Sequence, residues 1–90
     1  MDFEWDEAKR QRVLDARGLD FLDAPLLFDG RPILTAPTSR PDEERWLSIG
    51  EIAGRLLAVV WTWRDSRIRI VTMRRSRDEE KRRYRALFGA

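Results

Sequence analysis

The chain has 90 residues, of which 42% are hydrophobic and 38% are charged. This length accommodates one domain with one modest core, and the hydrophobic share excludes a wholly disordered chain. The absence of cysteine and histidine excludes a disulfide framework and argues against a bound metal ion. The longest apolar run, residues 56–61, is too short to span a bilayer. We therefore expect a cytoplasmic protein with no membrane, metal or cofactor partner.

Charge is distributed unevenly along the chain, although the formal net charge is only +2. Residues 1–54 contain 7 basic and 12 acidic side chains, whereas residues 55–90 contain 11 basic and 4 acidic ones. Such segregation creates a local positive potential. We therefore expect an anionic partner to bind the C-terminal part of the chain.

Two helices are predicted near the N-terminus. Asp6 is placed to cap a helix over residues 7–17, and Gly18 is placed to end it in the left-handed conformation. A second, short helix is predicted over residues 20–28. Pro25 lacks an N–H group, so this helix either begins near the proline or is kinked there.

Four strands are predicted in the middle of the chain, connected by turns and by a loop over residues 36–44. Their ranges are 32–36, 45–50, 55–63 and 67–74. The third strand is apolar at nearly every position, as expected for a central strand covered on both faces. Trp61 and Trp63 alternate along this strand, and we expect both to pack in the core rather than to stack on bases.

A last helix is predicted over residues 77–88, because Ser76 and Glu79 match a capping box. One face of this helix carries Glu80, Tyr84, Leu87 and Phe88. The apolar members of this face are expected to pack on the sheet. The predicted fold is a single α+β domain over residues 1–90, with two N-terminal helices, a four-stranded antiparallel sheet and a C-terminal helix.

Five segments of the chain occur in an order seen in one known family. They are FEWDEAK at the start, a segment over residues 17–28 with RG, DF, DA and LF in that order, EERWLSIG, GRLLAVVWTWR and RIRIVTMRRSRDEEKRRY. In this order they resemble the BrnT family, the toxins of BrnT/BrnA type II toxin–antitoxin pairs. The resemblance covers almost the whole chain.

This resemblance implies a RelE-like fold and an endoribonuclease that cleaves RNA to inhibit translation. It also implies neutralisation by a BrnA-like antitoxin with a ribbon-helix-helix domain, so that DNA is contacted only through the antitoxin. The lack of cysteine and histidine and the scattered carboxylates predict that this cleavage needs no metal ion. Family members usually have KHG where this chain has ARG at residues 16–18, and many have a histidine before the EER segment. The alternative interpretation, motivated by the missing histidines, is a non-catalytic basic module that binds RNA or a protein.

Arginine is the residue type expected to promote RNA cleavage here, because a guanidinium binds phosphate in a bidentate manner and stays charged. Arg74 and Arg75 are the first catalytic candidates, where the last strand meets the last helix. Side chains alternate along a regular strand, so both reach one site only at a strand end or bulge. Arg75 is in phase with Arg69 on such a strand. Arg64, in the turn after the third strand, is the third catalytic candidate.

Lys9, Arg45 and Tyr84 are predicted to bind the substrate. Lys9 matches the D-x-x-K segment of the family, Arg45 begins a strand, and Tyr84 is suited to stack on a base. Each residue also has a purely structural interpretation, as an exposed lysine, a strand-end arginine or a core tyrosine. Glu43 and Glu44 are weaker candidates for a general base, because an acidic loop explains them better.

Overall fold

The computed structural model describes residues 1–38 and 42–89. The helices and strands of this part of the chain are, in order, β1 (Phe3–Glu4), α1 (Glu7–Arg17), η1 (Phe21–Phe28), β2 (Ile33–Pro37), β3 (Trp46–Ile52), β4 (Arg55–Arg64), β5 (Arg67–Arg75) and α2 (Asp78–Phe88). The predicted α+β class is confirmed. The predicted loop over residues 36–44 includes residues 39–41, which lie outside the described part. No helix in the described part has the length and apolar composition needed to cross a bilayer.

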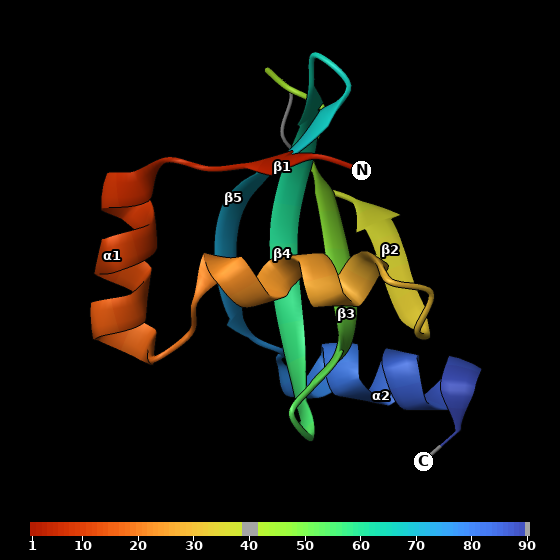
Figure 1. Ribbon diagram of the computed structural model, residues 1–90. Helices are drawn as coiled ribbons and strands as arrows, with labels where there is room; N and C mark the ends of the chain where they lie inside the picture. The colour runs from red at the N-terminus through yellow and green to blue at the C-terminus, as the bar shows by residue number, and fades with distance from the viewer. Residues whose placement is uncertain (39–41, 90) are drawn as a thin grey trace.

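The sheet has five strands in the spatial order β1-β5-β4-β3-β2 (Figure 1). The prediction of four antiparallel strands was therefore wrong in number and in type, because β1 pairs in parallel with β5. Phe3 lies opposite Ile68, and the Ile68 amide donates to the Asp2 carbonyl at 2.9 Å. The sequence did not predict β1, because two residues are too few to show an alternating pattern and the partner strand β5 lies near the other end of the chain.

Helix α1 begins and ends where the sequence predicted. The Asp6 side chain accepts hydrogen bonds from the amides of Ala8 and Lys9, at 2.9 and 3.3 Å. Gly18 follows the helix with φ of 69°, a left-handed conformation that glycine adopts without a steric penalty. Both signals are local, which is why the sequence alone was sufficient here.

The second predicted helix is a 3-10 helix rather than an α-helix. Pro25 lies inside it and interrupts the backbone hydrogen bonding that an α-helix requires. Phe21, Ala24 and Leu27 recur every third residue and are all fully buried, which matches the three residues per turn of this helix type. In Figure 1, η1 crosses one face of the sheet, and α1 lies beside β5.

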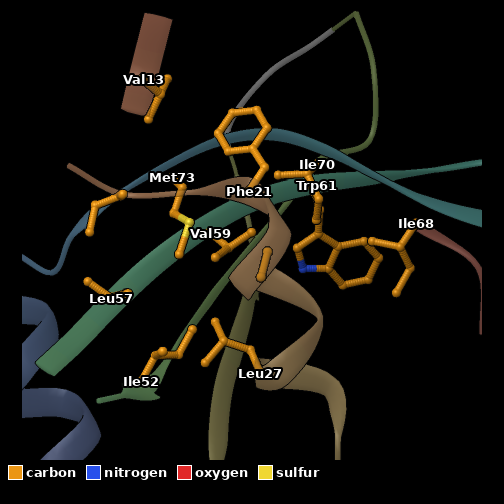
Figure 2. Packing of buried hydrophobic residues seen from close by; sticks show 12 residues of the cluster. Val13, Phe21, Leu27, Ile52, Leu57, Val59, Trp61, Ile68, Ile70 and Met73 are labelled. Carbon is orange, nitrogen blue, oxygen red and sulfur yellow. The ribbon is translucent and has the colours of Figure 1, made fainter. Parts of the chain in front are cut away.

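The core fills the space between η1, α1 and this face of the sheet (Figure 2). Trp61 is only 7% exposed, and its indole nitrogen donates to the Ser48 hydroxyl at 2.8 Å. Trp63 lies on the same face, with its ring against Trp61 at 5.4 Å between centroids. Its side chain is nevertheless 52% exposed, so the prediction that both tryptophans pack in the core was wrong for Trp63. Trp63 stands near the end of β4, where the core layer ends.

Helix α2 also differs from the prediction in its cap and its packing. Its cap residue is Arg77, whose amide donates to Glu80 at 2.8 Å, so the predicted Ser76 and Glu79 box was one residue out of register. Glu80 is fixed there because Arg74 also donates to its carboxylate, at 2.8 and 2.9 Å. No residue of α2 is buried, and Leu87 is 63% exposed. The expected burial of the apolar face of α2 on the sheet was therefore wrong.

Phe21→Ala is expected to lower the free energy of unfolding by about 3–5 kcal/mol, because it leaves a cavity under the sheet. Leu22→Ala is the matched control on the same helix, because its side chain is 57% exposed. The control is expected to cost about 0.5 kcal/mol or less. Urea unfolding followed by circular dichroism measures both variants. Equal losses in the two variants would contradict this assignment of the core face.

Candidate functional site

A cleft of about 200 Å³ opens at the end of the sheet where β4 turns into β5. Its walls come from the start of α1, the segment before β3, and strands β4 and β5. The lining residues are Asp6, Lys9, Glu43, Arg45, Thr62, Arg64, Arg69, Ile70 and Val71. Four of these residues are basic and two are acidic, and we call this region the cationic cleft.

The pairing of β4 with β5 determines which side chains reach the cationic cleft. Trp61 pairs with Ile70 on the face that η1 covers. Neighbouring residues of a strand point to opposite faces, so Thr62 and its partner Arg69 lie on the other face. Arg64 is in phase with Thr62 and lies on this face too. The strand pairing therefore places two arginines beside each other at one end of the sheet.

A bulge in β5 changes the phase of this strand. Val60 and Trp61 are neighbours in β4, yet their partners Thr72 and Ile70 lie two residues apart, which leaves Val71 without a β4 partner in the described ladder. An extra residue of this kind reverses the faces on which the following side chains lie. With the bulge, Arg69 is in phase with Arg74 and not with Arg75, unlike on the regular strand considered from the sequence.

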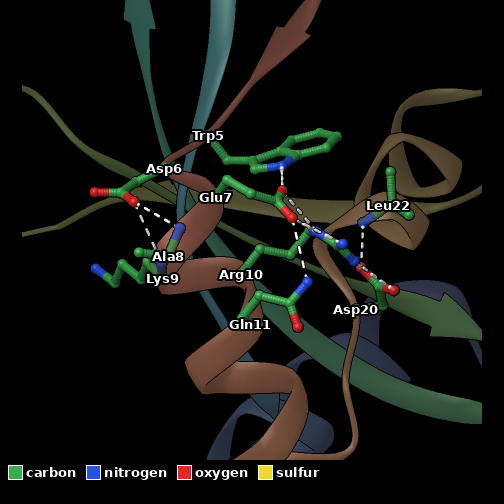
Figure 3. Close-up of polar contacts among 9 residues, drawn as sticks. All are labelled: Trp5, Asp6, Glu7, Ala8, Lys9, Arg10, Gln11, Asp20 and Leu22. Atoms are coloured by element: carbon green, nitrogen blue, oxygen red, sulfur yellow. Dashed lines mark hydrogen bonds and ion pairs between the residues drawn. The ribbon is translucent and has the colours of Figure 1, made fainter.

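Lys9 is the contribution of α1 to the cationic cleft. The cap formed by Asp6 fixes the backbone of Lys9. Figure 3 shows the side chains of Asp6 and Lys9 on the opposite side of α1 from Arg10. The pKa of Lys9 is lowered, mainly because partial burial disfavours the charged form and also because Arg45 and Arg12 are nearby cations. A lysine with a lowered pKa is better suited to exchange protons near neutral pH.

Arg10 anchors the start of α1 to the start of η1 (Figure 3). Its guanidinium binds Glu7 at 2.8 Å and Asp20 at 2.9 Å. Hydrogen bonds from Arg10 and Gln11 lower the pKa of Glu7 to about 2. Because α1 supplies Lys9, this network determines where the lysine stands relative to the strands.

Glu43 lies between two guanidinium groups of the cationic cleft. Its carboxylate binds Arg45 at 2.9 Å and Arg64 at 3.6 Å. The Thr62 hydroxyl donates to the Glu44 carbonyl at 2.6 Å and so attaches this segment to β4. Both arginines therefore already hold an oxyanion, and a phosphate has the oxygen geometry to replace it.

Arg69 has an equivalent partner on the other side of the cationic cleft. Its guanidinium binds Glu4 of β1 at 2.9 Å. The sequence interpretation did not select Arg69 and mentioned it only as in phase with Arg75 on a regular strand. Its place beside Thr62 and Arg64 is set by the register of β4 and β5 next to their turn.

Arg74 and Arg75 lie far from Arg64 along the same pair of strands. Arg74 pairs with Ala58 and Arg75 with Leu57, whereas Arg64 pairs near the β4–β5 turn. Six residues of strand separate these positions, which corresponds to roughly 20 Å. Successive pairing also sends Arg74 and Arg75 to opposite faces, because the bulge lies before them rather than between them. The structure therefore does not bring the three predicted catalytic arginines together.

Arg74 is occupied by an internal partner. It binds Glu80 at 2.8 Å, and their hydrogen bonds raise the pKa of Arg74 and lower the pKa of Glu80. The side chains are 23% and 13% exposed, respectively. This pair connects the end of β5 to the first turn of α2.

Arg75 and Tyr84 line a second hollow, which we call the α2 groove. It has a volume of about 480 Å³ and lies between α2, the start of β2 and the β3–β4 turn. Its lining residues are Pro32, Glu51, Gly54, Arg55, Leu56, Arg75, Lys81, Tyr84, Arg85, Phe88 and Gly89. The Tyr84 hydroxyl donates to the Pro32 carbonyl at 3.0 Å. Of the predicted residues, the cationic cleft thus contains Lys9, Arg45 and Arg64, and the α2 groove contains Arg75 and Tyr84.

The fold and the cationic cleft define a small α+β protein whose sheet ends in a site suited to a phosphate group. The family model described as "Ribonuclease toxin, BrnT, of type II toxin-antitoxin system" matches residues 5–80. The chain therefore belongs to the BrnT family. Comparison with curated protein sequences gave no match. The matched residues include the basic lining of the cationic cleft, whereas α2 continues beyond them to Phe88.

Protonation of Glu7 is expected to weaken the anchor of α1 in acid. Its pKa is about 2 in the folded chain against an ordinary value of 4.5, so its stabilising effect is present above about pH 4.5 and is lost as the pH falls toward 2. Glu7→Gln is expected to flatten the dependence of the unfolding free energy on pH over this interval. Denaturant titrations at several pH values measure this dependence. A variant with the same dependence as the wild type would contradict the proposed anchor.

Proposed function

We propose that this protein is an endoribonuclease toxin that cleaves RNA in the cationic cleft and is neutralised by a protein antitoxin. Membership of the BrnT family supports the ribonuclease activity and the antitoxin. The single observation that supports the location is the convergence of Lys9, Arg45, Arg64 and Arg69 on one cleft, in which Glu43 binds Arg45 and Arg64. A partner of the BrnA type with a ribbon-helix-helix domain fits this proposal, and DNA would then be contacted only through the antitoxin.

Binding of the scissile phosphate would use the guanidinium groups that now hold Glu43. Arg45 and Arg64 present donors on two sides of that carboxylate, and Arg69 lies across the cleft. Preorganised donors of this kind stabilise the charge that develops on phosphorus oxygens in the transition state. The cleft thus supplies electrostatic stabilisation in a chain that contains no histidine.

Proton transfer would be divided between Glu43 and Lys9. As the phosphate displaces it, the Glu43 carboxylate accepts the proton of the ribose 2′-hydroxyl, and the 2′-oxygen forms a bond to phosphorus. The bond from phosphorus to the 5′-oxygen breaks, and the Lys9 ammonium donates a proton to that oxygen. The products are a 2′,3′-cyclic phosphate and a 5′-hydroxyl. The lowered pKa of Lys9 supports this role.

This chemistry would require no metal ion. Within the described residues, the cationic cleft contains two carboxylates, those of Asp6 and Glu43. Asp6 accepts backbone amides at the start of α1, and Glu43 binds arginines. Neither carboxylate is therefore arranged with others as an oxygen cage for a divalent cation.

A different role is proposed for Arg74. Its hydrogen bonds to Glu80 support a positioning function, in which it holds α2 against the end of β5. Its distance along the strand from Arg64 argues against a contact with the same phosphate. Arg75 and Tyr84 belong to the surface of the α2 groove rather than to the reacting centre.

Arg64→Ala is expected to slow cleavage of a fluorescent RNA oligonucleotide by about 10²–10³-fold, because it removes one preorganised donor. Arg75→Ala, at the other end of the β4–β5 ladder, is the matched control and is expected to keep the wild-type rate. EDTA is expected to leave all rates unchanged. A rate that falls only in Arg75→Ala would move the site to the junction of β5 and α2. Salt-dependent RNA binding without any cleavage would favour the non-catalytic module, which the absence of histidine also favours.

Glu43→Gln separates binding from chemistry. The variant loses the proposed base and also removes the negative charge that competes with phosphate for Arg45 and Arg64. We expect a non-cleavable 2′-O-methyl RNA to bind several-fold more tightly and cleavage to slow by about 10²-fold or more. Fluorescence anisotropy and single-turnover kinetics measure the two effects. Weaker binding together with an unchanged rate would exclude this role for Glu43.

A further inference from the structure

The α2 groove presents apolar side chains that nothing in the described chain covers. Phe88, which lines the groove, is 44% exposed, and Leu87, its neighbour along α2, is 63% exposed. Tyr84 and Phe88 form one aromatic surface, with ring centroids 4.8 Å apart. Large exposed apolar side chains that gather at a groove often mark a binding surface.

The same groove carries cations without carboxylate partners. Within residues 1–38 and 42–89, no ion pair involves Arg55, Arg75, Lys81 or Arg85, and Glu51 is the one acidic residue in the lining. In the cationic cleft, by contrast, Glu43 and Glu4 already bind arginines. An acidic ligand therefore meets unpaired positive charge in the α2 groove.

The walls of the α2 groove are fixed before any ligand binds. Arg74 and Glu80 hold the first turn of α2, and the Tyr84 hydroxyl holds its middle to the Pro32 carbonyl at 3.0 Å. A preorganised groove loses little conformational entropy on binding. It therefore suits a flexible segment of a partner that becomes ordered as it binds.

The α2 groove is remote from the cationic cleft. Arg55 begins β4 and lines the groove, whereas Arg64 ends β4 and lines the cleft. Ten residues of strand correspond to roughly 30 Å, and Figure 1 shows α2 at the opposite end of the sheet from β1 and the β4–β5 turn. A ligand in the groove does not by itself cover the cleft.

We propose that the α2 groove binds an acidic amphipathic segment of the antitoxin. Its carboxylates would contact Arg55, Arg75 and Arg85, and its apolar side chains would cover Phe88 and Leu56. Leu56, a partly exposed residue of the lining, favours a protein over RNA, because an aliphatic side chain offers a nucleic acid neither charge nor an aromatic ring for stacking. The identity of the partner rests on the proposed function, whereas the chemistry of the groove does not.

The test compares groove variants in complexes with the full-length cognate antitoxin. Arg85→Glu and Phe88→Ala change exposed side chains of the groove, and Arg82→Glu makes the same charge change on an exposed residue of α2 outside it. We expect the first two variants to weaken the complex at least tenfold in calorimetry, and Arg82→Glu to stay within twofold of the wild type. Unchanged affinity in both groove variants would overturn the proposal.

Two further readouts distinguish this proposal from the proposed function. Arg85→Glu and Phe88→Ala are expected to keep the wild-type rate of RNA cleavage, whereas Arg64→Ala is expected to lose cleavage and to keep its antitoxin. If the wild type cleaves no RNA but the groove variants still lose the antitoxin, the groove assignment stands and the ribonuclease site falls. If Arg85→Glu weakens binding of 2′-O-methyl RNA and leaves antitoxin binding unchanged, the groove is an RNA surface and this proposal is wrong.

Discussion

The antiparallel pairing of β4 with β5, with its bulge at Val71, is the constraint on which the rest of the structure depends. It directs Trp61 and Ile70 toward the core under η1, and it directs Thr62 and Arg69 toward the opposite face. The same ladder therefore builds the core with one set of side chains and the cationic cleft with the other. A strand without the bulge would have put either the residues before it or those after it on the wrong face.

Two basic surfaces form at opposite ends of this ladder, and they differ in how their charges are balanced. In the cationic cleft, carboxylates of Glu43 and Glu4 hold the arginines in place. The carboxylates keep the guanidinium donors oriented. An anion that binds more strongly than a carboxylate can displace them. In the α2 groove, cations lie beside exposed apolar side chains and have no acidic partner among the described ion pairs. The balance of charge suits catalysis in the cationic cleft and recognition of a partner in the α2 groove.

Local signals were sufficient for much of the fold, whereas pairing between distant segments was not predictable. The bounds of α1 follow from Asp6 and Gly18, because capping involves only neighbouring residues. The sequence also selected Lys9, Arg45 and Arg64 one by one, but it gave no reason to place them in one cleft. Arg69 was not selected, because its place beside Thr62 and Arg64 depends on the register of β4 and β5, which the sequence interpretation did not determine. The pairing of Arg74 with Glu80, and the parallel strand β1, likewise depend on contacts that no local pattern encodes.

RNA is proposed to bind at the β4–β5 end of the sheet. Amide chemical shifts, recorded while a short 2′-O-methyl RNA is titrated into the isotope-labelled protein, test it most directly. The largest changes are expected at Lys9, Arg45, Thr62 and Arg69. Changes confined to α2 and the β3–β4 turn would contradict it.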